Sequence, residues 1–202
     1  PGIEASDILE RLKLEQGKYF VVSAHREENI ESKCNFSDLM ASLKAIAESY
    51  DAPLVFSTHP RTRKRIEKLG IKDLDKRIHF LKPLGLLDYV KLQMNARCVI
   101  SDSGTITEES SILSFPAITI RQAHERPEGM DEGTLIMCGL NANRILDSIE
   151  IATSQYADTA RPFSMVKDYD TENVSRKVLG IILSYTDYVN RTVWFKQEDC
   201  LS

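Results

Sequence analysis

Short apolar runs alternate with segments of helical periodicity along most of this chain. The apolar runs are rich in Val, Ile, Phe and Leu and are four or five residues long, which is typical of buried strands. They lie at residues 19–23, 53–57, 78–81, 98–101, 116–120 and 134–138. Between the runs, apolar residues recur at helical spacing, and Phe36, Leu39 and Leu43 predict a helix over residues 36–47. Further helices are predicted at residues 61–69, 86–94, 143–156 and 171–189, and another carries Glu108 and Glu109.

The alternation of strands and helices predicts the fold class. Fully apolar strands, each followed by a helix, indicate a parallel sheet that is covered on both faces. We therefore expect a Rossmann-like, doubly wound α/β fold with right-handed crossovers, forming a single domain over residues 1–202. In this class of fold a ligand binds at the carboxyl ends of the strands.

The composition is globular with a slightly acidic balance. Hydrophobic residues make up 42% and charged residues 28% of the 202 residues, and the net charge is −4. This balance disfavours a broad nucleic-acid surface, and no apolar run approaches the roughly 20 residues that cross a bilayer. The four cysteines form no CxxC pair, so we expect a reducing, cytoplasmic setting. Because the chain starts at Pro1 without an initiator Met, we expect it to be part of a longer protein.

Polar side chains gather in the loops after four of the predicted strands. These loops cover residues 23–29, 57–63, 102–104 and 121–129, and they hold three of the four histidines. Taken singly, each histidine is explained at least as well by a structural, hydrogen-bonded role as by a functional one. For residues 61–65, a solvated basic helix face is a better explanation than a binding site. Zinc is disfavoured because no HxH or HxxxH pair is present. Together, cationic and imidazole groups at one edge of the sheet predict an anion pocket, most simply for a diphosphate.

The stretch from Ser101 to Glu109 is the most informative part of this edge. Its sequence, Ser-Asp-Ser-Gly-Thr-Ile-Thr-Glu-Glu, indicates a strand end, a tight turn and the start of a helix. A helix start offers free N–H groups and a positive dipole end to a phosphate, and Glu108 or Glu109 is placed to accept hydrogen bonds from ribose hydroxyls. The alternative is an ordinary helix start capped by Asp102 or Ser103.

Three common nucleotide or hydrolase fingerprints are missing from the sequence. No GxGxxG follows the first strand, so NAD and FAD are disfavoured, and no GxxxxGK[ST] indicates a P-loop. No GxSxG nucleophile elbow is present either. We therefore expect neither a cofactor nor a metal.

Four motifs together resemble the non-hydrolysing UDP-N-acetylglucosamine 2-epimerases. They are residues 25–29 (His-Arg-Glu-Glu-Asn), 58–60 (Thr-His-Pro), 101–109 and 124–129 (His-Glu-Arg-Pro-Glu-Gly). Their order fits the carboxy-terminal half of that family over nearly the whole chain. The resemblance implies a two-Rossmann-domain architecture of the glycosyltransferase-B type, in which this half holds the nucleotide and an amino-terminal domain is missing. It also implies a homodimer when the protein is complete.

The resemblance implies roles for particular residues around UDP. His25 matches the active-site histidine near the diphosphate, and Ser103 and Gly104 match residues that hold phosphate. Glu109 matches the carboxylate that binds the ribose hydroxyls, and Arg126 matches an arginine that approaches the diphosphate.

Three further residues match positions at the edges of the family's sites. Tyr89 falls where family members often place an aromatic ring beside the uracil. Arg26 and His59 match positions that help to hold a second, regulatory UDP-sugar in some bacterial members.

The family reaction inverts C2 of a UDP-2-acetamido sugar by eliminating UDP to a 2-acetamidoglycal and adding it back on the other face. The acid and base carboxylates lie mainly in the other domain, so we expect the isolated half to be inactive. Glu27, Thr105 and the pair Ala123-His124 depart from the common family pattern and resemble the capsule and O-antigen branch. That branch converts UDP-2-acetamido-2,6-dideoxy-L-talose into UDP-N-acetyl-L-fucosamine. The alternatives are a nucleotide-binding domain of a UDP-sugar glycosyltransferase and a binding or regulatory domain without catalysis.

Overall fold

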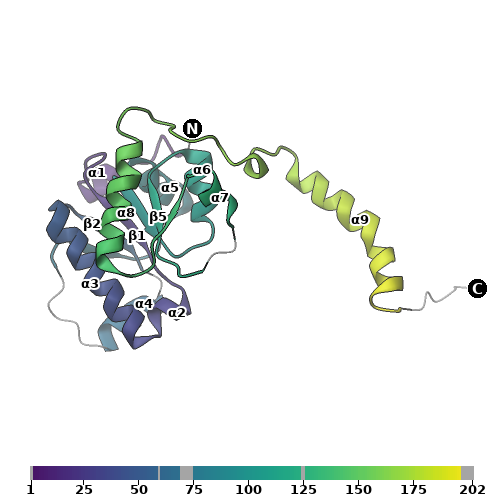
Figure 1. Cartoon of the computed structure of the whole chain (residues 1–202), viewed down its shortest axis with the longest axis horizontal. Helices are drawn as coiled ribbons and strands as arrows, with labels where there is room; N and C mark the ends of the chain where they lie inside the picture. Colours follow the sequence, from purple (N-terminus) through teal and green to yellow (C-terminus); the bar gives the residue numbers. More distant parts are fainter. Residues whose placement is uncertain (1, 59, 69–74, 124–125, 197–202) are drawn as a thin grey trace, which may run out of the picture. The chain divides into compact units, whose positions relative to one another are not determined.

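The computed structural model describes residues 2–58, 60–68, 75–123 and 126–196, and Figure 1 traces them in sequence order. The chain forms two compact units, of which one runs to Tyr169 and the other begins at Asp170. The first unit contains the sheet, and the second contains the long helix α9 (Val174–Thr192). Of the helices in the described residues, none combines the length and the apolar character needed to cross a membrane.

One parallel sheet forms the centre of the first unit, with the strand order β3-β2-β1-β4-β5-β6. The strands are β1 (Phe20–Ser23), β2 (Leu54–Ser57), β3 (Ile78–Leu81), β4 (Cys98–Ser101), β5 (Ala117–Thr119) and β6 (Ile136–Met137). Phe20 pairs with Leu54 on one side and with Cys98 on the other. The chain thus winds outward from β1 in both directions, which confirms the predicted Rossmann-like α/β fold. The strand order reverses between β1 and β4, and a crevice opens at this point in such sheets.

Helices cover both faces of the sheet, as the apolar strands predicted. The helices of this unit are α1 (Ile8–Leu12), α2 (Glu27–Ile30), α3 (Lys33–Tyr50), α4 (Pro60–Lys68), α5 (Leu86–Asn95), α6 (Ile106–Leu113), α7 (Glu128–Asp131) and α8 (Ala142–Gln155), with a 3₁₀ turn η1 (Lys167–Tyr169).

Alternate residues of β1 enter two separate cores. Phe20 and Val22 pack with α3 and α8, which lie side by side in Figure 1, whereas Val21 packs with α1, α5 and α6. Successive side chains of a strand point to opposite faces, so one apolar run supplies both cores.

The structure differs from the sequence expectations mainly where tertiary contacts determine whether a segment is helical and how long a strand is. The segment after β1 is not a loop throughout, because α2 forms within it and buries Asn29 and Ile30. The last two strands are shorter than their apolar runs, with β6 reduced to Ile136–Met137 at the edge of the sheet. An edge strand has hydrogen-bond partners on one side only, so its ends are less strongly held in the ladder.

The second unit carries an apolar stripe on α9. Val178, Ile181, Ile182, Tyr185 and Tyr188 recur at helical spacing and are exposed. Helical residues at this spacing lie on one face and are normally covered in a folded protein. The helix therefore offers a surface for a partner element.

Asp102, directly after β4, ties together the loops of the two central strands. Its side chain is fully buried, and both carboxylate oxygens accept hydrogen bonds from the backbone N–H of His25, at 3.0 and 3.1 Å. Oδ2 also accepts from the Arg26 N–H and the Asn29 side chain, each at 3.0 Å. In return, the Arg26 Nε donates to the backbone oxygen of Asp102 at 2.9 Å. A buried carboxylate with this many donors holds the β1 loop rigidly against the β4 loop.

Replacing this carboxylate should destabilise the first unit. Asp102→Ala leaves several buried donors without an acceptor, and we expect a loss of at least about 3 kcal/mol in the free energy of unfolding. The measurement is denaturant unfolding followed by circular dichroism. Asp158→Ala, which removes an exposed carboxylate, is the matched control. Coinciding unfolding curves for the two variants would contradict the bracing role of Asp102.

Candidate functional site

A cavity of about 360 Å³ opens at the carboxyl ends of the central strands. It lies where the strand order reverses, so residues from β1, β2, β4, α5 and α6 converge on it. Four residues singled out from the sequence line it, namely His25, Tyr89, Ser103 and Glu109. A volume of this size is ordinary for a small-molecule site, which supports the predicted ligand pocket at this edge.

The start of α6 forms one wall of this cavity. The helix begins at Ile106 with Thr105 as its N-cap, and the Thr105 side chain makes no capping hydrogen bond. The Ser103 and Thr105 hydroxyls are 2.9 Å apart and hydrogen-bond to each other. The alternative that Asp102 or Ser103 caps the helix is therefore wrong. Asp102 turns away to the β1 loop, which leaves the first N–H groups of α6 without a side-chain cap.

Gly104 and Arg126 are in close contact beside this wall. A Cβ at Gly104 would collide with the Arg126 guanidinium, which would have to move away from the helix start. The Arg126 Nε lies 3.1 Å from Oε1 of Glu108, on the first turn of α6. The terminal nitrogen Nη1 of Arg126 lies against Gly104, just before the start of α6. Ser103, Gly104 and Arg126 also line one small hollow together. The three residues assigned to phosphate by resemblance are thus brought together.

Glu109 on α6 and Tyr89 on α5 also line the cavity. Glu109 accepts a 2.6 Å hydrogen bond from the side chain of Gln93 on α5. Burial raises the pKa of Glu109, while hydrogen bonds from Gln93 and Thr105 oppose that rise. Burial also raises the pKa of Tyr89 to about 12, opposed by a hydrogen bond with Ser23, so Tyr89 is a neutral phenol near pH 7.

His25 projects from the β1 loop, with Nδ1 3.4 Å from Oδ1 of Asp102. Its side chain is 46% exposed and remains accessible from the cavity. Arg26 is also held by Asp102 but does not line this cavity. His59, the other residue assigned to a regulatory site, lies outside the described residues, as does His124 in the segment before Arg126.

Sequence reasoning missed the residues that hold the others in place. Gln93 is completely buried, and Tyr169 donates a 2.6 Å hydrogen bond to Oε1 of Glu128, the first residue of α7. Gln93 stands three residues after Val90, on the buried face of its helix, and a polar residue at a position of apolar spacing is a usable signal. No comparable local signal marks Tyr169, because its partner is 41 residues away.

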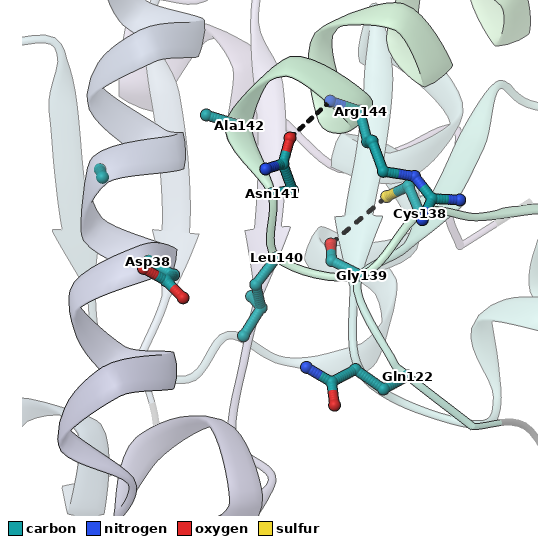
Figure 2. A pocket seen from close by; sticks show the side chains of 9 residues that line it. Asp38, Gln122, Cys138, Gly139, Leu140, Asn141, Ala142 and Arg144 are labelled. Carbon is teal, nitrogen blue, oxygen red and sulfur yellow. Dashed lines mark hydrogen bonds between the residues drawn. The ribbon is translucent and has the colours of Figure 1, made fainter.

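A larger cavity of about 480 Å³ lies elsewhere, between α3 and the start of α8. Figure 2 shows Asp38 and Arg144 on opposite sides of it, with Gln122 and Cys138 also at its wall. The Asn141 side chain accepts from the Arg144 N–H at 3.2 Å and so caps α8. One acidic and one basic side chain, Asp38 and Arg144, together with a helix start that is already capped, do not form an anion-binding site. The strand-end cavity is therefore the better candidate for a nucleotide.

Solved structures of similar proteins include two with extensive overlap. The UDP-N-acetylglucosamine 2-epimerase of Rickettsia bellii is 50% identical, with a TM-score of 0.82 over 97% of this chain and 52% of that chain. The Methanocaldococcus jannaschii UDP-GlcNAc 2-epimerase in complex with UDP-GlcNAc and UDP is 29% identical, with a TM-score of 0.76 over 91% of this chain and 50% of that chain. This chain therefore spans about half the length of each.

The curated relatives agree with the solved structures. The UDP-N-acetylglucosamine 2-epimerase of Methanocaldococcus jannaschii is 34% identical over 148 residues, which cover 72% of this chain and 40% of that relative. A family model described as UDP-N-acetylglucosamine 2-epimerase matches residues 2–183. Because that match takes in most of the sequence, the chain belongs to the UDP-N-acetylglucosamine 2-epimerase family.

Proposed function

We propose that this chain is the UDP-binding, carboxy-terminal half of a non-hydrolysing UDP-N-acetylhexosamine 2-epimerase. The observation that carries the proposal is the strand-end cavity, where Ser103, Glu109, Tyr89 and His25 converge beside an uncapped helix start. An uncapped helix start suits a diphosphate, and the partly buried Glu109 carboxylate suits ribose hydroxyls. The family match over residues 2–183 supports the same assignment.

In the proposed reaction, this half stabilises UDP as a leaving group. Elimination of UDP from the sugar gives a 2-acetamidoglycal, and UDP then adds back on the other face with C2 inverted. Negative charge develops on the diphosphate as the bond to C1 breaks. The N–H groups at the start of α6, the Ser103 hydroxyl and the Arg126 guanidinium would stabilise that charge.

His25 is the catalytic residue that we assign to this half. Asp102 faces Nδ1 of the imidazole, which leaves the Nε2 edge for the ligand. Proton removal at C2 needs carboxylates placed as acid and base. We assign those carboxylates to an amino-terminal domain, in keeping with the chain's coverage of about half of its relatives. The apolar stripe of α9 is a surface that such a domain or a second subunit could cover.

The capsule and O-antigen branch of the family is our proposal for the sugar. Its substrate would be UDP-2-acetamido-2,6-dideoxy-L-talose and its product UDP-N-acetyl-L-fucosamine. Support comes from the sequence departures from the common family pattern at Glu27, Thr105 and the pair Ala123-His124. The complete protein would act as a homodimer, and Arg26 with His59 would hold a regulatory UDP-sugar.

Titration calorimetry with UDP, uridine and UDP-N-acetylglucosamine tests the proposed site directly. We expect the 202-residue chain to bind UDP more tightly than uridine, because the diphosphate meets the α6 start and Arg126, and to show no turnover. Equal affinities for UDP and uridine would contradict the diphosphate cradle. Turnover of each candidate UDP-sugar by the complete protein distinguishes an epimerase from a glycosyltransferase.

Glu109→Ala should weaken UDP binding by about 1–3 kcal/mol, because charge-assisted hydrogen bonds to the ribose are lost. The loss should be smaller for 2′-deoxy-UDP, which lacks one of the hydroxyls. Glu150→Ala, on the exposed surface of α8, is the matched control. Unchanged UDP affinity in the Glu109 variant would remove this carboxylate from the site.

Arg126→Ala should weaken UDP binding strongly and leave uridine binding nearly unchanged, because the guanidinium serves the diphosphate. Gly104→Ala should show the same ligand dependence, since a Cβ at Gly104 displaces the guanidinium without removing its charge. Calorimetry with both ligands measures the two losses. A variant that loses the same factor for UDP and uridine would contradict the phosphate role of the residue concerned.

A further inference from the structure

Gln93 stands out as a polar side chain in an apolar setting. It projects from α5 and has no exposed surface, and its Nε2 donates a 2.6 Å hydrogen bond to Oε2 of Glu109 on α6. Its own Oε1 is buried and has no hydrogen-bond partner among the described residues. An unpaired buried carbonyl costs stability, so the side chain is retained in spite of that cost.

The helix that carries Gln93 is itself firmly held. The Tyr19 hydroxyl donates to the backbone oxygen of Leu92 at 2.7 Å, and the Gly17 N–H donates to that of Asn95 at 2.9 Å. Tyr89 lies one turn before Gln93 on the same helix and lines the cavity. Residues four apart share a helix face, so α5 presents a phenol and an amide to the same side of the site.

The direction of the hydrogen bond matters for Glu109. An amide N–H donates to an ionised carboxylate, and it engages Oε2 from the side of the core. Glu109 is only partly buried and lines the cavity, so the rest of its carboxylate faces the ligand position. We propose that Gln93 is a positioning residue that holds Glu109 ionised and oriented for the ribose of UDP. This inference rests on the proposed nucleotide site.

The electrostatic surroundings explain why such a donor is needed. Burial and the neighbouring Glu108 both raise the pKa of Glu109, and the hydrogen bonds from Gln93 and Thr105 lower it. Tyr89 faces Glu109 from α5 and is neutral near pH 7, while His25 lines the same cavity from the β1 loop. Loss of the Gln93 donor therefore moves the pKa of Glu109 upward, and the carboxylate protonates at a higher pH.

Gln93→Met is the decisive variant, because it keeps the length of the side chain and removes both amide groups. We expect a melting temperature equal to or above that of the unaltered chain, since an unpaired buried carbonyl is replaced by an apolar group. UDP binding should weaken about tenfold, the effect of losing one hydrogen bond to a charged group. Gln93→Leu serves as a second variant, and Gln155→Met, at the exposed end of α8, is the matched control.

The preference for UDP over 2′-deoxy-UDP, measured by calorimetry across pH, separates positioning from general damage. The two ligands share the same diphosphate, so its titration cancels in the ratio of their affinities. We expect the preference of Gln93→Met for UDP to be smaller than that of the unaltered chain and close to that of Glu109→Ala. As the pH falls, the preference should disappear at a higher pH in Gln93→Met than in the unaltered chain. A Gln93→Met chain with the unaltered preference and pH profile would overturn the inference.

The same experiment distinguishes a failure of this inference from a failure of the proposed function. If the unaltered chain shows no preference for UDP over uridine, the proposed nucleotide site fails. If it binds UDP but does not distinguish UDP from 2′-deoxy-UDP, the ribose role of Glu109 fails, and the role of Gln93 with it. If the preference is present and Gln93→Met leaves it intact, only the positioning role is overturned.

Discussion

The buried carboxylate of Asp102 determines how the two central strand ends meet. It accepts hydrogen bonds from the N–H groups of His25 and Arg26 and from the Asn29 side chain, at about 3 Å each. A carboxylate that is fully removed from water needs such donors, and here they all come from the segment after β1. The strand order reverses between β1 and β4, so this contact joins the two loops beside the candidate nucleotide cavity. The first turn of α6 starts from this braced loop.

Three residues of the candidate site, two that line the cavity and one beside it, each have a partner side chain. Asp102 faces the imidazole of His25, Glu108 pairs with Arg126, and Gln93 donates to Glu109. Side chains held in this way lose little further freedom when a ligand binds, which favours tight and oriented binding. Under the proposed function, this arrangement would hold the leaving UDP in place while another domain supplies proton transfer.

Periodicity predicted most of the fold because strong local patterns and tertiary structure agree. The runs at 78–81 and 98–101 match β3 and β4, and the expected helix at 86–94 matches α5 (Leu86–Asn95) within one residue. The secondary-structure predictions were less accurate where the local sequence has only a weak preference for helix or strand. The α2 turn depends on burying Asn29 and Ile30 against neighbouring elements, and β6 is short because it lies at the sheet edge. The sequence also pointed to four of the residues that line the cavity, His25, Tyr89, Ser103 and Glu109, because strand-end loops of one parallel sheet lie at the same edge.

The sequence by itself determined the order of elements, the parallel sheet, the edge that carries the site, and the family. These follow from residue spacing and from short motifs, both of which are local along the chain. Only the tertiary structure decided what each polar side chain does. Asp102 could have capped α6, yet it binds the β1 loop 76 and 77 residues away, and Gln93 reaches Glu109 across 16 residues. A hydrogen bond between distant segments depends on how helices and strands pack, and no local pattern records that packing.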